Sequence, residues 1–339
     1  MRKSRLLYIV LSALVSLGLL WLLLANVKTE DVVRTLSRVY IPALGLYMAT
    51  ALLAAWLRAW RYKLLLRPQP ISWPNMFLVT FIRNSLIDLL PARLGSLSYI
   101  YVLNKRLGFP FEQATSSFVQ AFVLDFLTLS PFLVLSVLAV GLGANSLSTP
   151  ALLLVAFAFF LLVALVYWRL IPVARFGLSV FGRALRVLKL EEKPAARTAV
   201  QKFDLTIQSL EAVRRQGRGA LIFLLSLLIR LAKYISVFAL FFGLLRSHGF
   251  SAGDLSFWTF ILGLSGAELT SALPVKGLAG FGTWESAWAL TFGLMGFDPE
   301  LAVISGIGVH LLTNVFEYSL GLASILILAW PYLLKKRRP

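Results

Sequence analysis

The stretch Leu90-Pro91-Ala92-Arg93-Leu94-Gly95 interrupts an apolar segment from Trp73 to Leu103, and Leu273-Pro274-Val275-Lys276-Gly277 interrupts a second one from Leu255 to Gly296. Proline lacks a backbone donor and glycine permits sharp turns, so each segment is predicted to form a helix, a break and a second helix. In a membrane, such a break is tolerable only where protein or a watery cavity satisfies the exposed backbone groups.

Long apolar runs surround these two segments. Hydrophobic residues make up 59% of the 339-residue chain and charged residues 14%, a composition that soluble globular domains do not have. A helix needs roughly 20 residues to cross about 30 Å of hydrocarbon. We therefore predict an all-α integral membrane protein in which residues 1–339 form one transmembrane domain. Six full transmembrane helices are predicted, at Leu6–Ala25, Pro42–Leu66, Phe111–Gly141, Pro150–Trp168, Ala220–Leu245 and Pro299–Trp330.

The basic residues orient these helices. They lie at the ends of apolar segments rather than on one soluble face, so the net charge of +18 indicates a membrane surface and not nucleic acid. By the positive-inside rule the basic side is cytoplasmic, which places both termini in the cytoplasm and the chain in the inner (plasma) membrane. This holds only if both interrupted segments return to the side they entered. We predict two re-entrant helical hairpins, the first entered from the cytoplasm and the second from outside.

A short repeat follows the two hairpins. Residues 107–114 read LGFPFEQA and residues 295–302 read MGFDPELA, and each precedes or opens a long span. The pattern predicts two copies, residues 42–142 and residues 220–330, inverted in the membrane as in many secondary transporters. The alternative is that similar turns recur by chance. Between the copies, residues 171–219 are basic and amphipathic, and predict either helices on the inner leaflet or a solvated connecting helix.

Ionisable side chains inside the apolar segments form the candidate site, because each costs at least a few kcal/mol in hydrocarbon unless paired or hydrated. The cations suit a phosphate group, and the carboxylates could neutralise them when the site is empty or carry a coupling proton. The alternative is that the charges only pair with one another, or that some arginines snorkel to the interface. The candidate residues are Arg58, Arg61, Arg83, Asp88, Arg93, Asp125, Arg230, Lys233, Glu268, Lys276, Glu285 and Glu317.

Two further features lie near these charges. Gly280 and Gly282 belong to a glycine-rich run at residues 277–282, which predicts a tight turn or a contact with a lipid headgroup rather than a nucleotide loop. His310 lies in the middle of a span, with Asn314 four residues on, and interhelical hydrogen bonding is the favoured interpretation.

The sequence does not predict an enzyme. The chain has no cysteine and two histidines, and we find no nucleophile-base pair and no metal-ligand spacing. No catalytic residue, cofactor or metal is therefore expected.

Several pieces together resemble a known family: residues 57–66 (LRAWRYKLLL), residues 90–95 (LPARLG), residues 105–108 (KRLG), Asp125, and residues 277–282 (GLAGFG) with Glu285. They resemble the flippase-like transmembrane domain of lysylphosphatidylglycerol synthases, which also occurs as stand-alone proteins. The chain departs from the family pattern at Ser96, Ala121, Phe122 and Trp284. The resemblance implies translocation of a phospholipid or polyprenyl-linked lipid between leaflets.

Two functions from different classes follow. The first is a flippase that moves an anionic lipid, and the second is a non-catalytic lipid-binding accessory protein for a membrane glycosyltransferase or a cell-envelope pathway. An intramembrane transferase is the least supported, since no catalytic constellation is present. Anionic membrane lipids are the expected partners; homo-oligomer formation and an envelope-biosynthesis partner are left open.

The orientation is testable with single cysteines, because the chain has none of its own. Thr149→Cys and Ser251→Cys should both react with an impermeant thiol reagent added outside intact cells, since both positions are predicted to face away from the cytoplasm. Protection of both cysteines until the membrane is permeabilised would reverse the predicted orientation.

Overall fold

The computed structural model describes residues 28–87, 95, 97–144, 149–270 and 280–335, with residues 18, 19, 21 and 23. Within these ranges the regular structure is entirely helical, as predicted. The elements are α2 Thr29–Ser37, α3 Ile41–Leu65, α4 Trp73–Ile87, α5 Ser98–Leu107, α6 Phe111–Leu127, α7 Leu129–Ala144, α8 Thr149–Val187, α9 Pro194–Arg215, α10 Gly219–Leu245, η2 Arg246–His248, α11 Phe257–Thr270, α12 Thr283–Leu294 and α13 Pro299–Lys335.

Among the described residues, five helical stretches are long and apolar enough to cross a membrane. They are Ile41–Leu65, Phe111–Val140, Leu153–Val187, Gly219–His248 and Pro299–Trp330. Each overlaps one of the six predicted spans, although Leu153–Val187 runs well past the predicted end at Trp168. The sixth predicted span, Leu6–Ala25, lies almost wholly outside the described residues. A multi-pass helical membrane protein is therefore confirmed.

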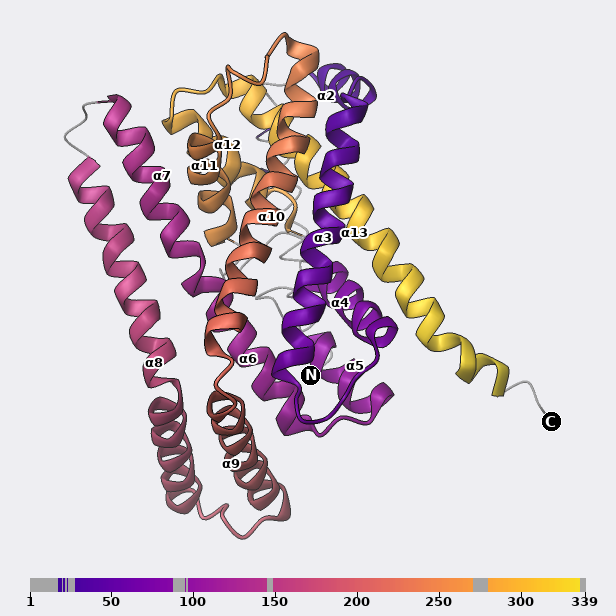
Figure 1. Cartoon of the computed structure of the whole chain (residues 1–339), viewed down its shortest axis with the longest axis vertical. Coiled ribbons are helices and arrows are strands. Elements are labelled where there is room, and N and C mark those ends of the chain that lie inside the picture. The colour runs from indigo at the N-terminus through magenta and orange to yellow at the C-terminus, as the bar shows by residue number, and fades with distance from the viewer. Residues whose placement is uncertain are drawn as a thin grey trace.

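The third predicted span is bent where α6 meets α7 (Figure 1). Pro131 has no N–H, so the carbonyl of Leu127 loses the partner that a continuous helix would give it. Thr128 closes α6 with its N–H and its hydroxyl, which donate to the carbonyl of Leu124 at 2.9 and 2.8 Å. The bend turns the end of α6 toward the centre of the molecule.

Both interrupted segments form pairs of short helices. Helices α4 and α5 have 15 and 10 residues, and α11 and α12 have 14 and 12, so each is shorter than a membrane span. The breaks themselves, at residues 88–94 and 271–279, lie outside the described residues. In Figure 1, α4 and α5 lie in the half of the bundle nearer α9, and α11 and α12 lie in the other half.

The two pairs have matching neighbours. Helix α4 packs against α5 and α13, and α11 packs against α12 and α7. Between the pairs, α3 lies along α10 with opposite direction: the N–H of Tyr40 donates to the carbonyl of Gly243 at 3.0 Å, and Arg61 bonds to Ser226 at 2.9 Å. The α3–α10 contact is therefore the long seam between the two halves.

Each half has its own buried aromatic core. In the first, the rings of Tyr62 and Tyr99 lie 4.3 Å apart between α3 and α5. In the second, Trp288 of α12 packs edge-on against Phe241 of α10 with 5.6 Å between ring centroids. Ring pairs of this kind contribute beyond their buried area and hold each short pair against its long helix.

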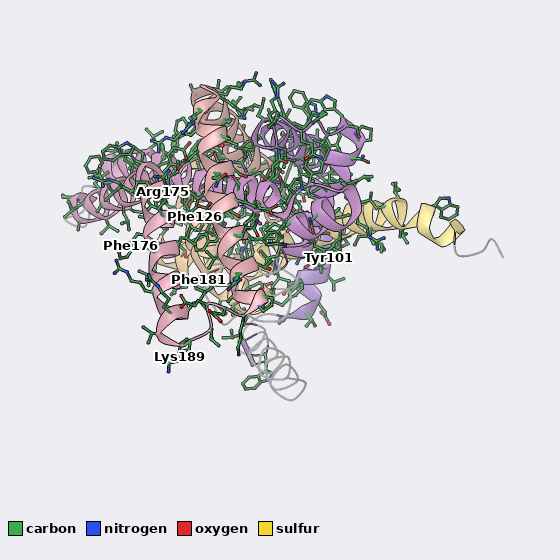
Figure 2. The ribbon with its side chains drawn as sticks, turned by 90° about the horizontal axis from the view of Figure 1, so that it is seen from below. Tyr101, Phe126, Arg175, Phe176, Phe181 and Lys189 are labelled. Atoms are coloured by element: carbon green, nitrogen blue, oxygen red, sulfur yellow. The ribbon has the colours of Figure 1, made fainter. Side chains whose placement is uncertain are left out.

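The connection between the halves is a helical hairpin. Helix α8 does not end near Trp168, where the span was expected to end, but continues past Pro172 to Val187 before α9 returns beside it. Figure 2 views the molecule from this end, with Arg175, Phe176 and Phe181 on the extension of α8 and Lys189 in the turn that follows it. The predicted helical content of residues 171–219 is confirmed; contact with the leaflet stays a prediction.

The crossing of α4 and α13 depends on Gly321. A Cβ atom there would lie 1.9 Å from Ser85 Oγ and 2.2 Å from Ser85 Cβ, so any side chain forces the helices apart. We expect Gly321→Val to lower the free energy of unfolding by about 1–3 kcal/mol. The measurement is the thermal midpoint in detergent. The matched control is Gly45→Val, a helical position with no atom within 4 Å of an added Cβ; equal midpoints for the two variants would contradict this packing.

Candidate functional site

A polar cavity of about 230 Å³ lies where the two halves meet. Helices α3, α4 and α6 of the first half and α10 to α13 of the second contribute to its lining. Seven of the predicted site residues line it: Arg58, Arg83, Asp125, Arg230, Lys233, Glu268 and Glu317. The structure thus brings together side chains that are up to 259 positions apart in the chain.

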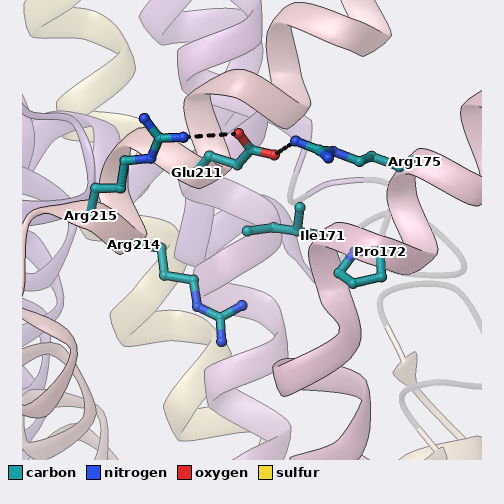
Figure 3. A pocket seen from close by; sticks show the side chains of 6 residues that line it. All are labelled: Ile171, Pro172, Arg175, Glu211, Arg214 and Arg215. Carbon is teal, nitrogen blue, oxygen red and sulfur yellow. Dashed lines mark hydrogen bonds and ion pairs between the residues drawn. The ribbon is translucent and has the colours of Figure 1, made fainter.

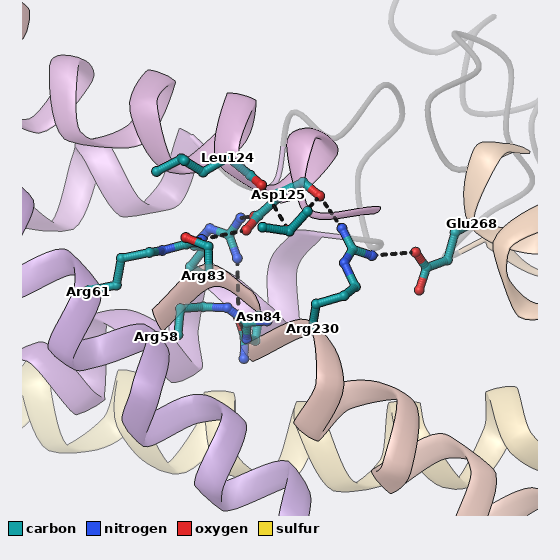
Figure 4. Close-up of polar contacts among 10 residues, drawn as sticks. Arg58, Arg61, Arg83, Asn84, Leu124, Asp125, Arg230 and Glu268 are labelled. Atoms are coloured by element: carbon teal, nitrogen blue, oxygen red, sulfur yellow. Dashed lines mark hydrogen bonds and ion pairs between the residues drawn. The ribbon is translucent and has the colours of Figure 1, made fainter. Parts of the chain in front are cut away.

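Asp125 of α6 is the centre of the first charge cluster (Figure 4). Its carboxylate accepts a hydrogen bond from Arg61 at 2.7 Å and lies 3.8 Å from Arg83. Arg61 is fully buried, and its guanidinium also bonds to Ser226 of α10 at 2.9 Å. Arg58 and Arg83 both donate to the side-chain oxygen of Asn84, at 3.1 and 3.3 Å. Three arginines from α3 and α4 therefore surround one carboxylate.

Glu268 of α11 is the centre of the second cluster. It lies 2.8 Å from Arg230 and 2.7 Å from Lys233, both on α10. Arg230 also donates to the backbone carbonyl of Asp125, as Figure 4 shows. That carbonyl lies in the last turn of α6, where the helix dipole attracts a cation, and it also accepts from the hydroxyl of Thr128 at 3.3 Å. Arg230 thus links the two clusters and the two halves.

The arginines have more donors than the described protein groups use. Arg58 Nε, Arg83 Nε, and both Nε and Nη2 of Arg61 are buried without a hydrogen-bond partner in the described part of the chain. Buried donors of this kind are costly unless something accepts from them. Four cations and three carboxylates line the described cavity. The spare donors and the local positive charge together suit an anionic ligand with several oxygen acceptors.

Glu285 and His310 form a third polar group at the edge of the cavity. The side chain of Glu285 is 0% exposed, and its two oxygens are held by the N–H of Gly282 at 2.8 Å and by His310 Nδ1 at 2.5 Å. Gly280 and Gly282 have φ values of 82° and 83°, which glycine adopts without strain. The tight turn at these glycines and the interhelical bond of His310 are confirmed, whereas a headgroup contact stays a prediction.

The twelve predicted ionisable residues divide into three groups. Seven line the cavity, while Arg61 lies behind Asp125 and Glu285 acts through His310. Three others, Asp88, Arg93 and Lys276, lie outside the described residues. Arg61 is fully buried and the side chain of Arg230 is 11% exposed, and each pairs with a carboxylate inside the bundle.

Some lining residues were missed by the sequence analysis. They are uncharged polar or aromatic side chains: Tyr47, Asn84, Ser226, Ser236, Trp284 and Thr313. The sequence does contain a signal for Asn84, because an amide side chain directly after an arginine in an apolar helix needs a hydrogen-bond partner. The sequence contains no such signal for the serines and Thr313, because a hydroxyl can donate to a backbone carbonyl of its own helix. Ser226 does so to the carbonyl of Ile222 at 2.8 Å.

A second hollow, between α8 and α9, is a weaker candidate (Figure 3). Glu211 there pairs with Arg175 and lies 3.8 Å from Arg215, and Arg175 is 65% exposed. Exposed ion pairs contribute little and are screened by salt. Within the described residues, no group of three or more His, Cys, Asp or Glu side chains could hold a metal ion.

The fold and the cavity define a polytopic α-helical membrane protein with a charged site buried between two halves. Residues 9–321 match the model of the lysylphosphatidylglycerol synthase transmembrane region, and the chain belongs to that family. No curated protein matches the chain.

The Arg61–Asp125 pair gives a stability prediction. We expect Arg61→Leu to lower the free energy of unfolding by about 3–5 kcal/mol, because it leaves a carboxylate inside the bundle without its closest cation. The double variant Arg61→Leu/Asp125→Leu should lose less than the sum of the two single variants, as measured by thermal denaturation in detergent.

The control is the exposed pair of Arg34 and Asp31, which are 3.7 Å apart. Arg34→Leu should change stability by less than about 1 kcal/mol. Additive effects of Arg61→Leu and Asp125→Leu would show that the pair does not act as a unit.

Proposed function

We propose that the protein moves an anionic lipid, a phospholipid or a polyprenyl-phosphate-linked lipid, between the leaflets of the inner membrane. The observation that carries this proposal is the cavity itself. Its described lining has more cations than carboxylates, and it includes Arg58 and Arg83, each with a buried Nε donor that has no partner in the described protein. Such a site is costly in hydrocarbon unless it serves an anion. Membership of the transmembrane-region family is consistent with a lipid as that anion.

The size of the cavity supports a headgroup as the bound part. At about 30 Å³ per liquid water, 230 Å³ corresponds to roughly eight waters. That space suits a phosphate headgroup but is too small for two acyl chains. In the proposed mechanism the tails therefore stay in hydrocarbon between the halves while the phosphate accepts from Arg58, Arg83 and Arg230.

The proposed architecture is an inverted repeat with six full spans and two re-entrant hairpins. Its support is the matching packing of α4 on α13 and of α11 on α7, and the location of the two short pairs in opposite halves of the bundle. In this arrangement the two pairs approach the cavity from opposite leaflets, with both termini in the cytoplasm. A headgroup passing from one pair to the other changes leaflet.

The carboxylates have a defined part in this mechanism. In the empty site Asp125 and Glu268 pair with Arg61 and Arg230. A phosphate competes for the same donors, so binding replaces one set of charge-assisted bonds with another. The exchange lets the headgroup enter and leave, because neither state leaves the arginines without acceptors.

The test is leaflet exchange of fluorescent phosphatidylglycerol by the purified protein in liposomes. Arg83→Gln and Arg230→Gln should each slow exchange by about 10- to 100-fold, since a hydrogen bond to a charged group is worth about 1.5–3 kcal/mol. The control is Arg175→Gln, on the exposed α8–α9 hairpin, which should leave the rate unchanged.

Two outcomes would change the proposal. Exchange no faster than in protein-free liposomes, together with saturable binding of the lipid, would favour the accessory lipid-binding function. Wild-type rates in correctly folded Arg83→Gln and Arg230→Gln would show that the cavity charges do not contact the lipid.

A further inference from the structure

His310 is an ionisable side chain of the described cavity lining to which the proposed mechanism gives no task. Its ring lies between Phe281 and Trp284, with ring centroids 4.6 and 4.9 Å away. Its side chain is 8% exposed, and it lines the same cavity as the arginines. A histidine that only joined two helices would not need to reach the cavity.

The bond to Glu285 determines which ring nitrogen carries a proton. The second oxygen of Glu285 already accepts from the N–H of Gly282, at the start of α12 where the helix dipole favours a carboxylate. With Glu285 ionised, His310 Nδ1 is the donor across the 2.5 Å contact between them. In the neutral ring, Nε2 is left as an acceptor; in the charged ring it becomes a second donor.

Nε2 has no hydrogen-bond partner among the described residues. Gly280 leaves the adjacent edge of the ring uncovered, since a Cβ atom there would lie 3.4 Å from Cε1 and 3.6 Å from Nε2. One turn further along α13, the side-chain nitrogen of Asn314 is also buried without a partner in the described structure, and Asn314 lines the cavity too. A donor-rich edge with these two groups would fit the oxygens of a headgroup, provided that Nε2 is protonated.

We propose that His310 takes up a proton from water when an anionic lipid headgroup enters the cavity, so that lipid binding and proton binding are coupled. The inference rests on the proposed function and adds its regulation. A lone pair on Nε2 repels a phosphate oxygen, whereas a protonated Nε2 donates a charge-assisted hydrogen bond to it. By linkage, the factor by which the lipid favours the charged ring equals the factor by which the proton strengthens lipid binding.

The other ionisable groups near the site come from every helix of the described cavity lining except α7, which contributes Leu129. They are Tyr47 and Arg58 of α3, Arg83 of α4, Asp125 of α6, Arg230 and Lys233 of α10, Glu268 of α11, Glu285 of α12 and Glu317 of α13. Arginine keeps its charge at all pH values of interest, and Asp125 and Glu268 are held by cations. Histidine is the side chain that ordinarily changes charge between about pH 5 and pH 8.

The experiment is equilibrium binding of fluorescent phosphatidylglycerol to the full chain in detergent at several pH values. Wild-type affinity should rise about tenfold between about pH 8 and about pH 5.5, from one additional charge-assisted hydrogen bond. His310→Gln should bind with an affinity that does not vary with pH. The control is His248→Gln, the other histidine of the chain, whose ring bonds to Thr35 on α2, away from the cavity lining.

A second measurement needs no substitution in the cavity lining. With two histidines in the chain, the NMR titration of the wild-type ring protons can be assigned with His248→Gln alone. The midpoint of the His310 signal should move to higher pH when the lipid is added, because the bound anion favours the charged ring.

The outcomes separate the two proposals. Saturable binding with equal affinity at all pH values, or a pH dependence that persists in His310→Gln, would overturn the proton coupling and leave the lipid site standing. A His310 midpoint that the lipid does not move would overturn it as well. Absence of saturable lipid binding at every pH would overturn both the coupling and the proposed function.

Discussion

Ions buried away from water must find opposite charges, and the rest of this structure depends on how that requirement is met. A guanidinium group at 0% exposure, as in Arg61, is stable only with a carboxylate and further acceptors around it. Asp125 and Ser226 supply them from two other helices. The same requirement draws Arg230 of the second half to the end of α6 in the first. Charge pairing therefore sets how the halves approach each other, while apolar contacts fill the remaining space.

The irregular backbone and the buried charged side chains act as hydrogen-bond partners for each other. At the bend after α6, Pro131 removes the donor that would serve the carbonyl of Leu127. Two residues earlier, the guanidinium of Arg230 bonds to the carbonyl of Asp125. At the turn before α12, the carboxylate of Glu285 receives the N–H of Gly282. In hydrocarbon each feature alone would be unfavourable. Together they form a polar centre in which helix ends and side chains satisfy one another.

The proposed transport of an anionic lipid uses two properties of this centre. Its carboxylates pair with the cations when no ligand is bound. Its unused arginine donors favour an incoming anion. In the proposed transport, the balance between internal pairing and ligand binding permits release as well as capture, since a site with no internal acceptors would hold the anion too tightly. In the proton coupling proposed above, His310, which bonds to Glu285, changes its charge with the occupancy of the site.

The sequence by itself determined the helical class, five of the described spans and the presence of two interrupted segments, because run length, proline and glycine act within a few residues of themselves. It also identified the ions of the cavity, since any charge in an apolar segment requires a partner. The local sequence pattern predicted that a span ends at Trp168, but helix α8 continues through Pro172 to Val187. Only the tertiary structure decided which ions meet: Arg61 with Asp125, Arg230 with Glu268, and Glu285 with His310. Those choices follow from packing between helices distant in the chain, which no local pattern encodes.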